Sequence, residues 1–205
     1  MLKLVAENLA KRFGPLKVFA DISFEVNRGE VLAVVGPNGS GKTTLLMLLL
    51  KAGYPSAGEV RYLDGDSVLD GDSVRRVTSL VAPYLNLYDN LTAEENLWFF
   101  ASVAGYQATG KQINGLLEKV DLEGRGHDLV SAYSSGMKQR LKYAVALLTE
   151  PGFLFLDEPT SNLDSDGKRI VFNLIEELRK DSVIVIATNE EEERDLADKL
   201  CRVNQ

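Results

Sequence analysis

One glycine-rich stretch has the residue types and spacing of a phosphate-binding loop. Residues 36–43 fit the pattern G-x-x-x-x-G-K-[ST] and lie between an apolar run and an apolar segment that begins at Leu45. Small residues let backbone N–H groups converge on an anion, Lys42 can bridge the outer phosphates, and the Thr43 hydroxyl can ligate Mg²⁺. The alternative is an ordinary glycine-rich turn. We predict nucleotide contacts from Gly36, Pro37, Asn38, Gly39, Ser40, Gly41, Lys42, Thr43 and Thr44.

A second candidate is the carboxylate pair Asp157 and Glu158, which follows an apolar run over residues 153–156. Ligands of parallel sheets gather where the strands end, and an Asp in that place suits Mg²⁺. Glu158 could polarise an attacking water, because hydrolysis needs a water-positioning group near the transferred phosphoryl group. An acidic pair alone is more often a solvated turn. Together with the phosphate loop, the pair favours catalysis.

The elements that must position these residues indicate an α/β fold. Continuous apolar runs, typical of strands buried on both faces of a parallel sheet, occupy residues 31–35, 153–156 and 183–187. Apolar residues recur at helical spacing over residues 137–148 and 170–178. Strand and helix patterns alternate, so we predict a mostly parallel sheet.

Two outer regions complete the pattern. Residues 2–13 and 18–26 carry the mixed alternation of antiparallel strands, which predicts an N-terminal antiparallel β subdomain. Residues 91–122 look helical without strands, as expected of a helical lobe inserted in the core.

Composition excludes several classes. The 205 residues contain one cysteine, Cys201, and one histidine, His127, so neither an internal disulfide nor a Cys/His zinc cluster is expected. No window approaches the roughly 18 apolar residues of a membrane span, and the first residues lack a secretion-signal layout. The net charge of -7 opposes bulk attraction to nucleic acid or anionic lipid. We expect a cytoplasmic protein that contacts no nucleic acid and meets a membrane only through another protein.

The order of the remaining motifs carries a family resemblance. Residues 133–140 (YSSGMKQR), followed by residues 157–164 (DEPTSNLD), resemble the signature motif, Walker B strand and D-loop of ABC ATPases. The resemblance covers essentially the whole chain and implies an ATP-binding subunit of an ABC transporter, using ATP and Mg²⁺. It also implies partners: a transmembrane permease subunit, and a second copy or related ATPase subunit that dimerises head to tail in the ATP state. Such a subunit would lie at the inner face of the cell membrane.

The implied fold is that of P-loop NTPases. We predict a single ABC ATPase domain over residues 1–205, with an ATP-binding core of residues 1–83 and 151–205. A helical lobe of about residues 84–150 would carry the signature motif. The compact length and the signature look most like exporter subunits, for example the haem-exporter ATPases of cytochrome c biogenesis.

The resemblance also assigns roles to single residues. Phe13 would stack on adenine, although burial in the first strands is an alternative. Asp164 would belong to the loop that crosses the dimer interface, although a helix-capping aspartate would look the same. The phosphate of the opposite subunit would be bound by Ser134, Ser135, Gly136 and Met137, of which Ser134 could equally be a plain helix N-cap.

Three positions depart from the family pattern. Asn189 stands where a histidine is usual; its amide can donate a hydrogen bond to the γ-phosphate but cannot carry a proton. The glutamine that usually links nucleotide and membrane partner should fall near Pro83, so a water on Mg²⁺ or Asn86 could replace it. Met137 replaces a glutamine that would complete a capping box. The departures bear on the hydrolysis rate more than on ATP binding, and Glu158, Lys42 and Asn189 remain the candidate catalytic residues.

Three other features have competing interpretations. Residues 190–193 are four glutamates, favoured in the solvated first turn of a helix by its dipole. The aromatic run 98–100 either packs in the lobe core or offers a docking patch. His127 is expected in a surface turn.

Two other functional classes are alternatives to a transporter subunit. An ABC ATPase acting on DNA or ribosomes would carry long coiled coils or tandem ATPase halves, which this chain lacks. A nucleotide-gated interaction subunit with little turnover is opposed by Glu158 and favoured by Asn189 and Pro83.

Overall fold

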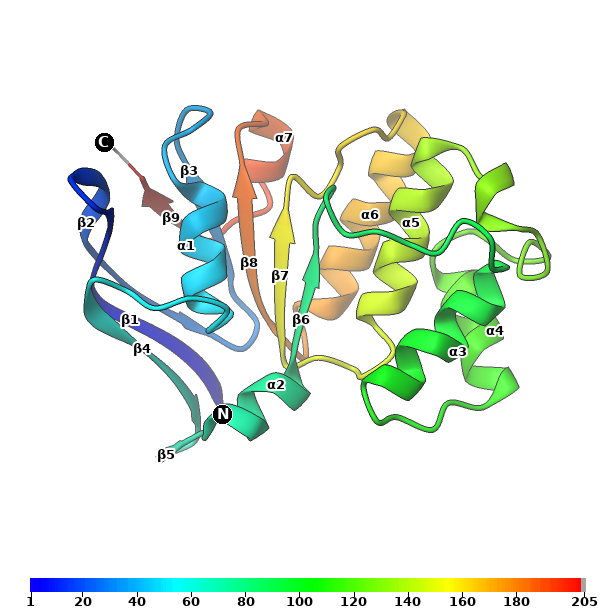
Figure 1. Cartoon of the computed structure of the whole chain (residues 1–205), viewed down its shortest axis with the longest axis horizontal. Helices are drawn as coiled ribbons and strands as arrows, with labels where there is room; N and C mark the ends of the chain where they lie inside the picture. The colour runs from blue at the N-terminus through cyan, green and yellow to red at the C-terminus, as the bar shows by residue number, and fades with distance from the viewer. Residues whose placement is uncertain (204–205) are drawn as a thin grey trace.

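Two β-sheets pack on the helix that follows the glycine-rich loop in the computed structural model, which describes residues 1–203 (Figure 1). The antiparallel sheet has the order β2-β1-β4-β5. Its strands are β1 (Leu2–Phe13), β2 (Leu16–Asn27), β4 (Ala57–Asp64) and β5 (Ser67–Val68).

The parallel sheet has the order β6-β7-β8-β3-β9, and all neighbouring strands in it are parallel. Its strands are β3 (Val31–Val35), β6 (Thr78–Val81), β7 (Phe153–Asp157), β8 (Val183–Thr188) and β9 (Lys199–Arg202). Every residue of the three central strands, β3, β7 and β8, is buried, because both faces of the sheet are covered. Their carboxyl ends therefore meet along one edge of the sheet.

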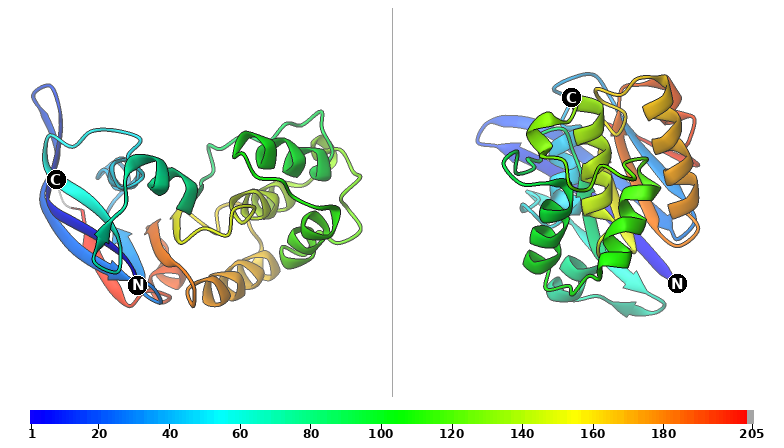
Figure 2. Two further views of the ribbon diagram at one scale, coloured as in Figure 1. Left: turned by 90° about the horizontal axis from the view of Figure 1, so that it is seen from below. Right: turned by 90° about the vertical axis from the view of Figure 1, so that its right-hand side faces the viewer.

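The helices divide between two hydrophobic clusters. Leucines of α1 (Lys42–Leu49) pack between residues of the antiparallel sheet and one face of the parallel sheet. The opposite face packs on α5 (Ser135–Ala146) and α6 (Ser165–Leu178), and α3 (Ala93–Val103) and α4 (Gly110–Lys119) pack in turn on α5. Figure 2 shows the antiparallel sheet and the α3–α4 pair at opposite ends of the molecule. The shorter helices are α2 (Gly71–Val77), the 3-10 turn η1 (Val130–Ala132) and α7 (Glu191–Arg194).

Side chains cap the lobe helices where the chain enters them. Thr92 accepts from Glu95 N at the start of α3 while Glu95 accepts from Thr92 N, and Thr109 forms the same capping box with Gln112 at α4. Each box satisfies two backbone donors that a helix start leaves open. The sequence of the lobe therefore fixes where these two helices begin.

The predicted fold class is confirmed: an α/β core with a parallel sheet, an antiparallel subdomain and helices α3 and α4 between β6 and β7. The strands β4, β5, β6 and β9, the helix α2 and the 3-10 turn η1 were not predicted from the sequence. The division into core and lobe at residues 84 and 150 stays a prediction. Within residues 1–203, the helices are too short or too polar to cross a bilayer.

Candidate functional site

The glycine-rich loop turns tightly between β3 and α1. Gly41 has a φ of 106°, and a Cβ atom there would lie 2.4 Å from Val18 Cγ1. A Cβ atom on Gly36 would lie 2.5 Å from the Val203 carbonyl oxygen. Glycine is therefore required at both positions, by backbone conformation at the first and by close approach at both. The loop ends at the N-terminus of α1, where helix N–H groups can bind an anion.

Lys42, the first residue of α1, folds its ammonium back onto the loop. Its Nζ donates to the Gly36 and Pro37 carbonyl oxygens at 2.9 and 3.3 Å, and to Asn189 Oδ1 at 3.0 Å. An ammonium has three donors, so these contacts use its full capacity. Phosphate oxygens would have to exchange with at least one of them. The lysine is thus placed to contact phosphates but is held by the protein before they arrive.

Asn189 reaches the loop because of the sheet register. Val35 of β3 pairs with Thr188 of β8, which brings the next residue beside the glycine-rich loop. Lys42 can only donate, so the atom facing it must be Oδ1. The amide nitrogen then donates to Asn38 Oδ1. Asn189 therefore joins Lys42 to Asn38 of the glycine-rich loop through one hydrogen bond to each.

The predicted metal ligands meet directly. Thr43 Oγ1 donates to Asp157 Oδ2 at 2.7 Å, and Asp157 is buried at 3% exposure. Hydroxyl and carboxylate oxygens are hard ligands of the kind Mg²⁺ prefers, and here they come from the start of α1 and the end of β7. The pair therefore fits a magnesium ion. Within residues 1–203, no cluster of three His, Cys, Asp or Glu side chains offers another metal site.

Sequence reasoning missed a tyrosine at this pair. Tyr84 OH donates to Asp157 Oδ2 at 3.4 Å, whereas Pro83 has no donor and Asn86 is exposed. Partial burial, followed by the nearby Asp157 charge, raises the pKa of Tyr84 to about 12. The phenol therefore stays protonated and donates at neutral pH. The signal in the sequence was an aromatic hydroxyl one residue from the expected glutamine position.

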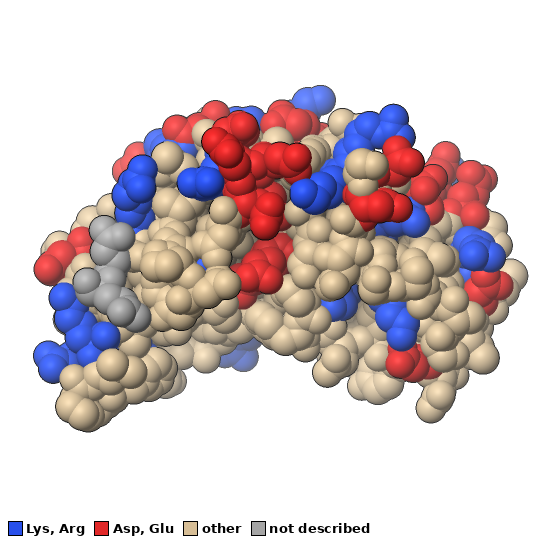
Figure 3. Space-filling view, turned by 90° about the horizontal axis from the view of Figure 1, so that it is seen from above, with Lys and Arg blue, Asp and Glu red and all other residues tan. Residues whose placement is uncertain are grey.

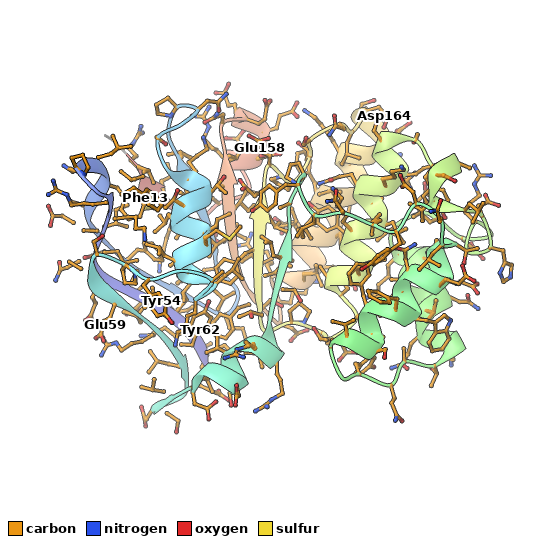
Figure 4. The ribbon with its side chains drawn as sticks, in the orientation of Figure 1. Phe13, Tyr54, Glu59, Tyr62, Glu158 and Asp164 are labelled. Atoms are coloured by element: carbon orange, nitrogen blue, oxygen red, sulfur yellow. The ribbon has the colours of Figure 1, made fainter. Side chains whose placement is uncertain are left out.

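Glu158 lies at the end of β7, just beyond the metal-ligand pair. Its backbone has a φ of 48° and its N–H donates to the Ala187 carbonyl oxygen at 2.9 Å, which fixes a sharp turn after the strand. The side chain is exposed and lines a cavity of about 430 Å³ with Asn38, Asn189 and Thr160. In Figure 4 it points upward from the strand end, on the side of the glycine-rich loop. The cavity offers a carboxylate, an amide and the loop to one bound molecule.

The glutamate run after Asn189 is only partly solvated. It does form a helical turn, α7, but the expectation of four solvated acids is wrong for Glu193, which is 1% exposed. Glu193 Oε1 accepts from Thr160 N at 2.9 Å and from the Thr160 hydroxyl. Among the described residues its Oε2 has no partner. This contact ties α7 to the loop that follows Glu158.

The comparisons with known proteins agree with this geometry. A family model described as ABC transporter matches residues 19–161, well over half of the chain. The chain belongs to the ABC transporter family. It is an ATP-binding domain of that family, as the residue patterns predicted.

Two curated relatives illustrate the match. The ABC domain is 37% identical over 188 residues to the uncharacterised ABC transporter ATP-binding protein YxlF of Bacillus subtilis, covering 91% of this chain and 62% of that protein. It is 35% identical over 205 residues to the daunorubicin resistance ATP-binding protein DrrA3 of Streptomyces coeruleorubidus, covering 98% of this chain and 65% of that protein. The chain therefore spans just under two thirds of the length of either relative.

A solved structure has the same fold. The ATP binding subunit of an ABC transporter superposes with a TM-score of 0.84 at 27% identity, covering 98% of this chain and 85% of that chain.

The signature residues of this ABC domain lie at the start of α5. Ser134 is its N-cap, because Oγ accepts from Met137 N at 3.2 Å, and both Ser134 and Ser135 are exposed. Gly136 sits close to the loop after Glu158, since a Cβ atom on it would lie 3.5 Å from the Asn162 carbonyl oxygen. The capping role is therefore present in the single chain, and the exposed serines leave the binding role open to a second chain.

Asp164 and Phe13 also occupy defined places. Asp164 Oδ1 accepts from Gly167 N at 2.8 Å, so it caps α6. Phe13 is 57% exposed at the end of β1, with Lys11 Nζ 4.8 Å from the ring centroid. Burial of Phe13 is therefore excluded, and its ring is accessible. Figure 4 shows Asp164 at the same upper end of the molecule as Glu158, and Phe13 apart from both on the antiparallel sheet.

Two surface features of the ABC domain remain. Trp98 and Phe99 are exposed at 41% and 39%, whereas Phe100 packs against the lobe core. His127 is exposed, as expected of a surface turn. Seen from the strand-end side, acidic side chains gather near the middle of the face with Lys and Arg on either side of them (Figure 3).

Proposed function

We propose that this ABC domain binds ATP with Mg²⁺ and hydrolyses it to ADP and phosphate. The observation that carries the proposal is the 2.7 Å hydrogen bond from Thr43 Oγ1 to Asp157 Oδ2, which joins the phosphate loop to the end of β7. Lys42 lies beside Thr43 on α1, and Glu158 follows Asp157. Groups for binding phosphate, holding a metal and positioning water therefore converge at one edge of the sheet.

Each residue has a separate task in this proposal. The loop N–H groups and Lys42 bind the phosphates, and Thr43 with Asp157 holds Mg²⁺, which neutralises phosphate charge when bound. The Glu158 carboxylate orients the attacking water and accepts its proton. Asn189 contacts the γ-phosphate through its amide nitrogen, while a phosphate oxygen takes the place of Asn189 Oδ1 on Lys42.

We also propose that ATP is enclosed by two chains, either two copies or one copy and a related ATPase subunit. Ser134 and Ser135 are exposed at the N-terminus of α5, where backbone N–H groups can face the γ-phosphate of the other chain. Gly136 and Met137 complete that surface. Asp164 would lie at the same interface while it caps α6, and Phe13 would stack on adenine within its own chain.

The dimer would power a transporter through a transmembrane permease subunit, from the cytoplasmic side. Trp98 and Phe99 are large exposed apolar side chains that suit contact with such a partner. The name of the DrrA3 relative concerns drug resistance, which supports export as the direction. Neither of the two relatives is named for haem export.

A second candidate is a nucleotide-gated subunit with little turnover. It is favoured by the contact of Lys42 with Asn189, where a protonatable histidine is absent, and by the missing glutamine at Pro83. Such a chain would bind ATP yet release phosphate no faster than a variant that lacks the Glu158 carboxylate.

Binding is tested by calorimetry with ATP and Mg²⁺. Lys42→Ala should abolish most of the binding, because it deletes the cation that contacts the outer phosphates. Lys51→Ala, an exposed lysine beyond the same helix, is the matched control and should bind as the parent does. Equal affinity in Lys42→Ala and parent would refute the phosphate-binding assignment.

The sandwich is tested by light scattering on Glu158→Gln, which removes negative charge near the γ-phosphate while blocking water activation. The variant should double its mass at saturating ATP and Mg²⁺, and Glu158→Gln combined with Ser135→Trp should not. A Glu158→Gln protein that binds ATP but keeps the monomer mass would contradict the dimer.

A further inference from the structure

The segment between β6 and α3 brings a hydroxyl to the metal-ligand pair. Tyr84 OH donates to Asp157 Oδ2 at 3.4 Å, and Thr43 Oγ1 donates to the same oxygen at 2.7 Å. Asp157 is buried, whereas Tyr84 is 46% exposed. The tyrosine therefore approaches the carboxylate from the open side, and the threonine approaches it from the phosphate loop.

A lysine of the signature helix holds that segment in place. Lys142 Nζ, on α5, donates to the Ala82 carbonyl oxygen at 3.2 Å and to the Pro83 carbonyl oxygen at 2.7 Å. Both carbonyl groups lie directly before Tyr84 in the chain. A charged donor on two consecutive carbonyl groups restricts their conformation, and with it the position of the next residue.

The same helix holds the segment that follows Asp157. Gln139 Nε2 and Tyr143 OH donate to the Pro159 carbonyl oxygen at 3.3 and 3.0 Å. Both Gln139 and Tyr143 are buried. Helix α5 therefore holds both the segment before Tyr84 and the segment after Asp157, and Tyr84 contacts the Asp157 carboxylate.

We propose that Tyr84 is a positioning residue for Asp157, and that Lys142 acts through Tyr84. This inference rests on the proposed Mg²⁺–ATP site. Pro83 cannot donate, so the phenol of the next residue supplies to Asp157 the side-chain hydrogen bond that position 83 cannot. A carboxylate that already accepts hydrogen bonds from two hydroxyl groups loses less conformational entropy when nucleotide and metal bind. The Tyr84 contact therefore raises the affinity for nucleotide in the presence of Mg²⁺.

The experiment compares Tyr84→Phe with the parent by calorimetry, using ATPγS in Mg²⁺ and again in EDTA. The change deletes one oxygen atom and keeps the ring. Affinity in Mg²⁺ should fall about 5- to 10-fold, as expected for one long hydrogen bond to a charged group, and affinity in EDTA should stay within about twofold. Tyr88→Phe, the same change on the same segment, is the matched control and should leave both affinities unchanged.

A double-mutant cycle tests the role of Lys142. Lys142→Met should reduce the Mg²⁺ affinity by a similar factor, and the double variant should be no weaker than the weaker single variant, because one interaction is lost in both. Thermal melting of each variant checks the fold.

Several results would overturn the inference. A Tyr84→Phe protein with parental affinity in Mg²⁺, or with an equal loss in EDTA, would show that the phenol does not position the carboxylate. Additive losses in the double variant would show that Lys142 does not act through Tyr84. A parent that binds no ATPγS in either condition would refute the proposed function itself, which is a distinct outcome.

Discussion

Removing the Asn189 side chain should separate nucleotide binding from hydrolysis. In the free protein its Oδ1 accepts from Lys42 Nζ at 3.0 Å and its amide nitrogen donates to Asn38. Asn189→Ala deletes both contacts and leaves β8 intact, because the side chain is exposed beyond the strand end.

Two effects of opposite sign follow. In the alanine variant, ADP no longer has to displace the Asn189 oxygen from Lys42, so ADP should bind more tightly. The lost contact is a partly exposed hydrogen bond of about 0.5 to 1.5 kcal/mol, which corresponds to roughly 2- to 10-fold in affinity. The γ-phosphate loses its contact with the amide, and one hydrogen bond to a charged group at about 1.5 to 3 kcal/mol corresponds to a rate roughly 10 to 100 times slower.

The assay is ADP calorimetry paired with steady-state phosphate release, on parent, Asn189→Ala and Asn189→His. The histidine variant should keep or raise the rate and add a dependence on pH near about 6 to 7, because imidazole titrates there. An alanine variant as active as the parent would make Asn189 a bystander, and weaker ADP binding by that variant would refute the competition for Lys42.

Three further results are expected. Phe13→Ala should weaken ATP binding about 2- to 10-fold, the range of one aromatic stacking contact, whereas Phe13→Tyr should preserve it. Equal ATP affinities of the two variants by calorimetry would refute stacking of Phe13 on adenine. Glu193→Ala should lower the free energy of unfolding in urea by about 1 to 3 kcal/mol, because the buried Thr160 donors lose their acceptor. The control Glu191→Ala removes an exposed side chain and should change the free energy of unfolding by less than about 0.5 kcal/mol. Equal effects of the two changes would contradict the role of Glu193. Burial raises the pKa of the Cys201 thiol to about 11. At pH 8 this thiol should therefore react with a disulfide reagent more than roughly 100-fold slower in the folded protein than in the protein unfolded in urea. Similar rates in the two states would show that the thiol is accessible.

The central strands could be predicted because burial on both faces leaves a continuous apolar run. The run over residues 31–35 coincides with β3 at both ends, and β7 and β8 each extend one residue beyond the apolar run. Edge strands were missed for the converse reason. Both β6 (Thr78–Val81) and β9 (Lys199–Arg202) are four residues long and contain polar side chains, so their place depends on a neighbour rather than on their own pattern.

Some residues of the candidate site could likewise be predicted from the sequence, whereas the contact of Tyr84 could not. Lys42, Thr43, Asp157 and Glu158 belong to local motifs whose spacing states their chemistry. The contact of Tyr84 with Asp157 joins residues 73 apart in the chain, and its geometry depends on the lysine of α5.

The burial of Glu193 could not be predicted from the local sequence. In the sequence it is one of four consecutive glutamates, three of them exposed, and nothing local distinguishes it. It is buried because Thr160, 33 residues earlier, supplies two donors. A contact of this kind is fixed by tertiary packing, so a sequence pattern cannot reveal it.

The most direct test of the ATP-hydrolysis site is the rate of phosphate release from ATP and Mg²⁺ by the purified chain and by Glu158→Gln. We predict steady release by the parent, and release at least roughly 100-fold slower by the variant, whose ATP affinity should be retained. Equal release by the two proteins would contradict the assignment of Glu158 and of the cavity that it lines.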